Sequence, residues 1–195
     1  MTKGPKGFSG AEKDELKTKL CLECEHSWAL HGYKKTSVRD LTANIGISTG
    51  AFYLLYSSKE ELFCETLKQV QDRLINRIWE IVDEKSGKAG FVKAMIWLFQ
   101  EYEKSPFLYN SDTPDFLAFL NRLHKDRIEK LKFDSVTFFY DIIERAHLIL
   151  KVDKEKAYAV INTLLYTVTI KDGFTNDHLE IFEILLNSII DELFE

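Results

Sequence analysis

Apolar residues along this chain recur at intervals of three and four positions, which is the spacing of one buried face of an α-helix. The first such stripe consists of Leu16, Leu20, Cys24 and Trp28. Before it, Ser9 and Glu12 form the S-x-x-E pattern of a capping box, and after it Gly32 is a helix stop signal. The pattern therefore predicts a helix from residue 9 to about residue 32.

The same reasoning predicts a succession of helices separated by short breaks. The longest begins at a second capping box, Ser58 to Glu61, and keeps apolar residues at helical spacing as far as Ile81. The chain has only 3 Pro and 9 Gly, too few for the many turns of a sandwich or barrel. We therefore predict an all-α fold, with helices over about residues 9–32, 37–45, 49–56, 58–84, 89–104, 114–131, 134–150, 154–172 and 177–194.

Composition and charge narrow the function classes. A hydrophobic share of 45% excludes a disordered chain. The net charge of −5 weighs against a nonspecific nucleic-acid coat protein, but the charge is uneven. Residues 1–62 hold nine Lys or Arg against eight Asp or Glu, a balance of +1, which leaves −6 for the remainder. Only the N-terminal part favours an anionic partner.

The N-terminal segment, the apolar runs and the cysteines indicate a cellular compartment. No apolar segment follows Lys3 and Lys6, so we expect no signal peptide, and no apolar run is long enough to cross a membrane. Three cysteines, an odd number, favour reduced thiols over a disulfide framework. The expected localisation is cytoplasmic.

Two short predicted helices, 37–45 and 49–56, are joined by a three-residue turn that contains Gly46. This arrangement is that of a helix-turn-helix, in which the glycine adopts a left-handed conformation that side chains disfavour. Ser48 is the expected N-cap of the second helix, whose exposed first residues would enter a DNA major groove. These residues are Thr49, Gly50, Ala51 and Tyr53.

The stretch from Gly32 to Leu62 resembles the N-terminal domain of TetR-family transcriptional regulators. The resemblance rests on Gly32-Tyr33, Thr36-Ser37-Val38-Arg39-Asp40-Leu41, Gly46-Ile47-Ser48, Gly50, Phe52-Tyr53 and Ser58-Lys59-Glu60-Glu61-Leu62. It implies a flexible arm over residues 1–8, a helix-turn-helix DNA-binding domain over 9–57, and a ligand-binding and dimerisation domain over 58–195 that begins with a long connecting helix, 58–84. It also implies a homodimer formed through the last two helices, which binds a palindromic double-stranded DNA operator and is released from it by a small-molecule effector. Repression is the commoner behaviour in the family, and activation stays open.

The resemblance also assigns roles to individual residues. Thr36, Ser37, Tyr53 and Lys59 match positions that contact phosphates, and Thr49, Gly50 and Ala51 match the surface that reads bases. Because Leu41 through Ser58 contains no charged residue, the remaining phosphate charge falls to neighbouring cations. The complete predicted DNA-binding set is Lys34, Lys35, Thr36, Ser37, Arg39, Ser48, Thr49, Gly50, Ala51, Tyr53 and Lys59. One departure is Leu55, which stands where the family usually has His or Tyr.

The middle and last helices carry more aromatic side chains than a compact bundle requires, together with a few polar groups. Such walls are typical of a pocket for a mostly apolar ligand. The predicted pocket residues are Trp97, Tyr102, Phe116, Phe119, Phe138, Phe139, Tyr140, His147, Asn162 and Tyr166. The ordinary alternative for each aromatic residue is core packing.

Three alternatives to a DNA-binding regulator can be weighed against the sequence. A thiol-based sensor would use Cys21 and Cys24 of the C-x-x-C motif, although buried cysteines more often behave as small hydrophobes. A helical adaptor would use the aromatic domain for a small molecule or a protein partner and show no specific DNA binding. An enzyme has no support, because the sequence patterns of the familiar hydrolase, P-loop and dinucleotide sites are absent. We expect no catalytic residues, metal or cofactor.

Overall fold

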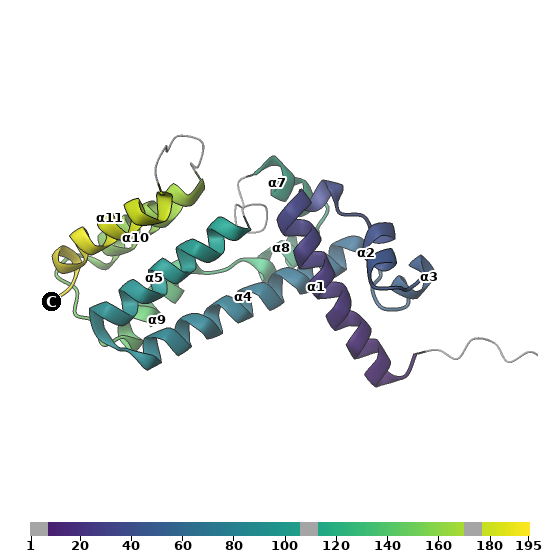
Figure 1. Ribbon diagram of the computed structural model, residues 1–195, viewed down its shortest axis with the longest axis horizontal. Coiled ribbons are helices and arrows are strands. Elements are labelled where there is room, and N and C mark those ends of the chain that lie inside the picture. The colour runs from purple at the N-terminus through teal and green to yellow at the C-terminus, as the bar shows by residue number, and fades with distance from the viewer. Residues whose placement is uncertain (1–7, 106–112, 170–176) are drawn as a thin grey trace, which may run out of the picture. The chain divides into compact units, whose positions relative to one another are not determined.

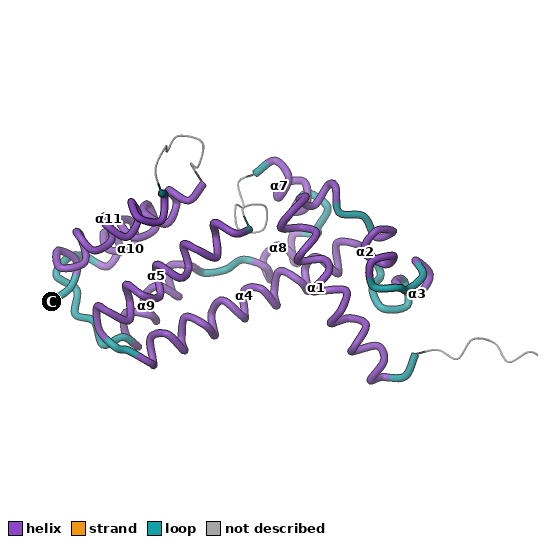
Figure 2. Tube along the Cα trace, viewed as in Figure 1, coloured by secondary structure: helices purple, strands orange, loops and turns teal. Residues whose placement is uncertain are grey.

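The computed structural model of the chain describes residues 8–105, 113–169 and 177–195 (Figure 1). Within these residues the regular structure is helical, and β-pairing is limited to one isolated bridge between Leu150 and Phe194 (Figure 2). The predicted all-α class is confirmed. No helix in the described ranges is long and apolar enough to cross a membrane.

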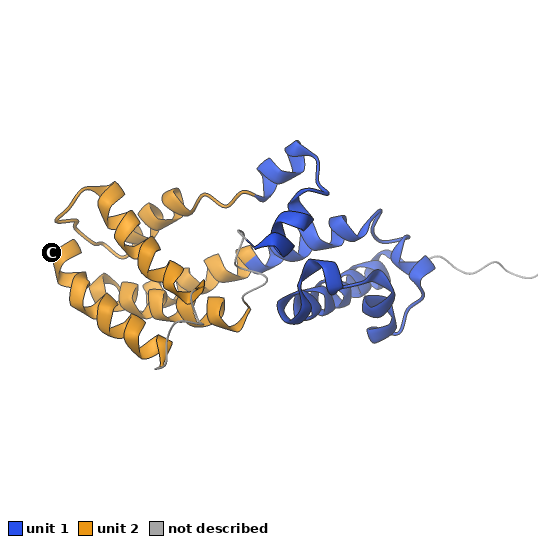
Figure 3. Cartoon of the chain, turned by 90° about the horizontal axis from the view of Figure 1, so that it is seen from above, with its two compact units in different colours: residues 1–70, 107–131 blue, residues 71–106, 132–195 orange. Residues whose placement is uncertain are grey.

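The chain forms two compact units (Figure 3). Unit 1 consists of residues 1–70 and 107–131, and unit 2 of residues 71–106 and 132–195. The described residues 113–131 thus belong to the same compact unit as the helix-turn-helix, whereas the resemblance grouped them with the ligand-binding and dimerisation domain. The functional boundary between 9–57 and 58–195 stays a prediction.

Unit 1 contains α1 (Gly10–Lys35), α2 (Val38–Asn44), α3 (Thr49–Phe52), the start of α4 (Lys59–Glu84), α7 (Pro114–Leu120) and α8 (Lys125–Leu131). The capping box of Ser9 and Glu12 is present at the start of α1. Three boundaries differ from the prediction. Helix α1 passes through a kink at Gly32, the expected helix 49–56 is only four residues long, and the expected helix 114–131 divides into α7 and α8.

The core of unit 1 is an aromatic cluster around Trp28 of α1, which is fully buried. Phe63 of α4 and Phe119 of α7 lie with their ring centroids 4.6 and 5.2 Å from the Trp28 ring. Phe116, one turn from Phe119 on α7, stacks on the same indole at 5.8 Å. Helix α7 is therefore held against α1 by buried aromatic surface, the largest favourable contribution that such side chains make to stability.

Unit 2 contains the rest of α4, α5 (Gly87–Lys104), α9 (Ser135–Arg145), α10 (Lys154–Tyr166), a 3₁₀ turn (Thr167–Thr169) and α11 (His178–Leu193). The predicted helix 134–150 ends early, because the backbone at His147 has a φ of 55°, which a right-handed helix does not allow. Residues 170–172 of the predicted helix 154–172 lie outside the described residues.

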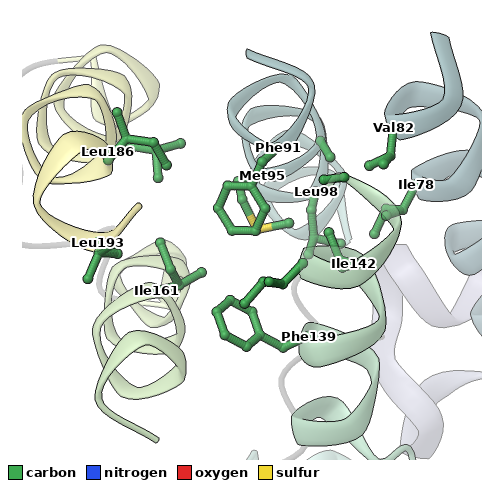
Figure 4. Close-up of a cluster of buried hydrophobic side chains, with 14 of the residues drawn as sticks. Ile78, Val82, Phe91, Met95, Leu98, Phe139, Ile142, Ile161, Leu186 and Leu193 are labelled. Atoms are coloured by element: carbon green, nitrogen blue, oxygen red, sulfur yellow. The ribbon is translucent and has the colours of Figure 1, made fainter. Parts of the chain in front are cut away.

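The core of unit 2 is built from apolar side chains of these helices, which point toward one another in Figure 4. The labelled members are Ile78 and Val82 of α4, Phe91, Met95 and Leu98 of α5, Phe139 and Ile142 of α9, Ile161 of α10, and Leu186 and Leu193 of α11. Helix α11 packs against both α5 and α10. Most of the apolar stripe on α11 is thus covered by other helices of unit 2.

Candidate nucleic-acid interface

The turn between α2 and α3 is held by backbone and side-chain hydrogen bonds. The Ser37 hydroxyl accepts from the Asp40 amide at 3.1 Å and caps α2, and the Ser48 hydroxyl accepts from the Ala51 amide at 3.1 Å and caps α3. Gly46 has a φ of 75°, in the left-handed region where glycine avoids the strain that a side chain meets. The predicted Ser48 cap and the predicted role of this glycine are confirmed, and the Ser37 cap is an addition from the structure.

Buried side chains fix the angle between the two helices. Leu41 of α2 and Phe52 of α3 are fully buried, and the Phe52 ring lies 5.7 Å from that of Tyr56. Leu55, the departure from the family pattern, is half-buried. The inner face of the motif is therefore committed to the core, which leaves the first residues of α3 on the surface.

The residues predicted to read bases lie on this surface. Ser48, Thr49 and Gly50 are exposed, and Ala51 is half-buried. Tyr53 is 57% exposed, with its ring set edge-on against Phe52. An exposed tyrosine can contact a partner through both its ring and its hydroxyl group.

The predicted phosphate contacts divide into two groups. Lys34, Lys35 and Arg39 are exposed, and Ser37 is partly exposed at the start of α2. Thr36 is 3% exposed, and its hydroxyl donates to the Gly32 carbonyl oxygen at 2.8 Å. The structure therefore places Thr36 at the end of α1, where its side chain is hydrogen-bonded to the helix next to the exposed Lys34 and Lys35.

Lys59 also faces inward. Its ammonium group donates to the Tyr33 carbonyl oxygen at 2.5 Å and lies 3.9 Å from the centre of the Tyr33 ring. Burial lowers the pKa of Lys59, although the charges of Glu60 and Asp115 act in the opposite direction. Its positive charge is thus used to join α4 to the end of α1.

Two residues in this region were not predicted from the sequence. Tyr33 is buried beneath the α1–α2 junction, and Asp115 of α7 accepts hydrogen bonds from the backbone there. Tyr33 stands within the quoted family motif, so a signal existed for it. Asp115 lies 82 positions from Tyr33, and no spacing along the sequence indicates that contact.

The predicted pocket residues are not all brought together. Phe116 and Phe119 belong to the aromatic core of unit 1, around Trp28. The other eight belong to unit 2, where Phe139 is buried, Trp97, Tyr102, Phe138 and Tyr140 are half-buried, and His147, Asn162 and Tyr166 are exposed. The prediction of an aromatic ligand site therefore narrows to the residues of unit 2.

The three thiols are buried in unit 1. The Cys21 sulfur lies 3.5 Å from the Tyr56 hydroxyl, and burial raises the pKa of both Cys21 and Cys24. Because the thiolate is the reactive form, these conditions disfavour rapid oxidation. Among the described residues no group of His, Cys, Asp and Glu is arranged to hold a metal ion.

Two short capped helices joined by a tight turn, with the first turn of the second helix exposed and three exposed cations in the same unit, are typical of the class of helix-turn-helix DNA-binding proteins. Within this class the chain is similar to the TetR family of transcriptional regulators. Residues 25–66 match the family model of bacterial regulatory proteins, tetR family.

Relatives by sequence share part of their length with this chain. The nucleoid occlusion factor SlmA of Vibrio vulnificus is 23% identical over 126 residues, which is 64% of each chain. An HTH-type transcriptional regulator of Bacillus subtilis, YuxN, is 36% identical over 90 residues, which is 46% of this chain and 30% of YuxN. The chain thus spans under two thirds of the length of these relatives.

Solved structures share the fold over nearly the whole chain. A transcriptional regulator from Saccharomonospora viridis in complex with choline has a TM-score of 0.66 at 13% identity, covering 93% of this chain and 99% of that one. FadR from Bacillus subtilis in complex with stearoyl-CoA has a TM-score of 0.59 at 16% identity, covering 89% and 96%. At these identities the likeness concerns the fold.

Proposed function

We propose that this protein is a homodimeric repressor that binds a palindromic DNA operator and releases it when a small molecule occupies unit 2. The observation that carries the proposal is the exposed first turn of α3, with Thr49, Gly50 and Tyr53 at the surface, in the same compact unit as the exposed Lys34, Lys35 and Arg39. Such a partner also implies that the protein acts in the cytoplasm.

The chemistry of this surface suggests how DNA is read. The three exposed cations neutralise phosphates, while Lys59 is held inward and contributes less than the sequence predicted. Since α3 presents no arginine to guanine, specificity rests on the Thr49 hydroxyl, the Tyr53 ring and hydroxyl, the Ala51 methyl group against thymine, and DNA shape. Each phosphate neutralised contributes a salt slope of about −0.9, so binding is expected to weaken steeply with salt.

The proposed dimer is supported by the outer face of α11. Ile184 and Leu185 are 58% and 42% exposed there, while Phe182, Leu186 and Ile190 on the inner face are buried. Helix α10, the neighbour of α11, adds the exposed Tyr166. A second copy that covers these apolar side chains forms a self-complementary interface, the usual arrangement in symmetric dimers.

The proposed effector site lies among the aromatic residues of unit 2. Tyr102 is half-buried, and the Tyr158 hydroxyl lies 2.7 Å from the Ser135 hydroxyl beside the Phe139 ring. Aromatic walls with a few hydroxyl groups suit a mostly apolar ligand. Structural neighbours that bind choline and stearoyl-CoA support ligand binding as a general property of this fold.

The test is a footprint on DNA upstream of the protein's own gene, with a random duplex as competitor. A protected palindrome, bound at least about 10³-fold more tightly than the competitor, supports the proposal. Equal and weak binding to both duplexes across a range of salt concentrations contradicts it.

The matched variants are Tyr53→Ala and Leu22→Ala. Both residues are more than half exposed, but only Tyr53 lies on the α3 surface. We expect Tyr53→Ala to weaken operator binding by about tenfold, as when one specific base or phosphate contact is removed, and to leave thermal stability nearly unchanged. Leu22→Ala should change neither. Equal operator affinity in both variants would remove Tyr53 from the interface.

A further inference from the structure

The end of α1 is a break in the helix that a residue of α7 repairs. At Gly32 the backbone has a φ of 78° and a ψ of 171°, so the N–H groups that follow no longer point at carbonyl oxygens one turn earlier. Residues 33–35 then form one further helical turn, which carries Lys34 and Lys35. The first N–H groups of such a turn need an external acceptor.

Asp115 supplies that acceptor. Its Oδ2 accepts from the Tyr33 amide at 2.5 Å and its Oδ1 accepts from the Lys34 amide at 3.1 Å. The carboxylate thus caps the turn as an N-cap residue does, but from a different helix. Gly32 is required for this approach, because a Cβ atom there would lie 2.6 Å from Asp115 Oδ2.

The same turn is fixed from α4. Lys59 donates to the Tyr33 carbonyl oxygen, and the Tyr33 hydroxyl donates to Glu60 Oε1 at 2.5 Å. The amide, carbonyl and hydroxyl groups of Tyr33 are therefore all engaged, by Asp115, Lys59 and Glu60 respectively. Helix α7, which carries Asp115, is itself anchored by Phe116 and Phe119 on Trp28.

From this arrangement we infer that Asp115 is a positioning residue for DNA binding: it holds the turn from which Lys34 contacts a phosphate of the operator. Asp115 does not itself contact DNA in this scheme. The inference deepens the proposed function and rests on it. Removing a negative charge from a DNA-binding unit ordinarily strengthens its attraction to phosphates. The inference predicts the opposite for Asp115, namely that its removal weakens operator binding.

The test is a double-mutant cycle on operator binding, measured from 50 to 200 mM salt with the full chain. Lys34→Ala should lower the magnitude of the salt slope by about 0.9 for each phosphate that is no longer neutralised. Asp115→Ala should weaken binding and lower the slope by the same amount, so its deficit relative to wild type shrinks about 3.5-fold per phosphate across this salt range, or about twelvefold for the two protomers of the dimer. The double variant should match either single variant, because both substitutions act on the same phosphate.

Two further variants separate positioning from other effects. Asp126→Ala removes the same charge from an exposed position in the first turn of α8 in unit 1 and should bind as tightly as wild type or more tightly. Asp115→Asn keeps an oxygen acceptor for one amide and should give an intermediate affinity, which keeps the test available if the alanine variant folds poorly. In DNA-free protein, hydrogen exchange at the Tyr33 and Lys34 amides should be slow in wild type and faster in Asp115→Ala.

The outcomes distinguish the inference from the proposed function. If wild type binds a specific operator but Asp115→Ala keeps the wild-type salt slope, or the two single effects add fully, the positioning role is wrong and the repressor stands. If wild type shows no specific binding, both fail. Reduced slope, non-additivity and faster exchange at the two amides together support the inference.

Discussion

At the scale of single residues, Tyr33 shows how the α1–α2 junction is stabilised. Burial on its own would raise the pKa of Glu60, yet the hydrogen bonds from Tyr33 and Ser58 and the charge of Lys59 outweigh it, so this pKa lies below its ordinary value of 4.5. A carboxylate whose pKa falls on folding stabilises the fold above its unfolded pKa and loses that contribution as the pH falls through the folded value.

Tyr33→Phe keeps the ring against Phe63 and Phe119 and removes only the hydroxyl that donates to Glu60. We expect the free energy of unfolding in urea to fall by about 1 kcal/mol at pH 7, less than for a fully buried charged pair because solvent screens the carboxylate. The difference from wild type should shrink as the pH falls below the ordinary value of 4.5 and through the lowered pKa of Glu60 in the folded protein.

Tyr53→Phe is the matched control, because its hydroxyl group belongs to an exposed side chain. It should change stability by less than about 0.5 kcal/mol at any pH. A Tyr33→Phe difference that stays constant down to pH 3 would show that the hydrogen bond to Glu60 contributes nothing that depends on its charge.

At the scale of elements, α3 depends on its cap because it is only four residues long. So short a helix has few internal hydrogen bonds. The bond that the Ala51 amide donates to the Ser48 hydroxyl is therefore a large share of the hydrogen bonds that hold α3 in place. Ser48→Ala should cost about 1 kcal/mol of stability and weaken operator binding, since the residues that read bases lie in that turn. Thermal unfolding and operator titration measure the two effects.

The control for this prediction is Asp134→Ala, which removes the cap of α9 in unit 2. It should lower stability by a similar amount and leave operator affinity unchanged. Equal reductions of operator affinity in the two variants would mean that general stability, and not the conformation of α3, controls binding.

At the scale of the whole molecule, self-association decides whether two recognition helices act together. Ile184→Glu places a charge on the exposed apolar face of α11 and should shift the protein to monomer, because a buried unpaired charge costs several kcal/mol in an interface. Operator affinity should fall with it, since a palindrome needs two half-site contacts. Analytical ultracentrifugation measures the state of association.

Ile149→Glu is the matched control: Ile149 is 59% exposed, against 58% for Ile184, but it lies outside α11. It should remain dimeric and bind the operator as wild type does. A dimer in both variants would exclude this face of α11 as the interface.

Local structure and the resemblance to a family of helix-turn-helix regulators could be read from the order of residues alone. Helix class, the Ser48 cap of α3 and the left-handed Gly46 follow from interactions within a few residues, which is why periodicity and capping patterns predicted them. Helix ends were less well predicted, as at α3 and α9, because they depend on single backbone conformations such as that of His147.

The partner that each buried face meets is known only from the folded chain. Periodicity indicates that Phe116 and Phe119 are buried, but not that they pack on Trp28. That contact places them in unit 1, whereas the other predicted pocket residues belong to unit 2. Periodicity likewise shows nothing of the inward turn of Lys59, or of Asp115 beneath the Lys34 turn. Contacts between residues more than about 20 positions apart carry no spacing signal, because the intervening chain can follow many paths and packing alone selects one.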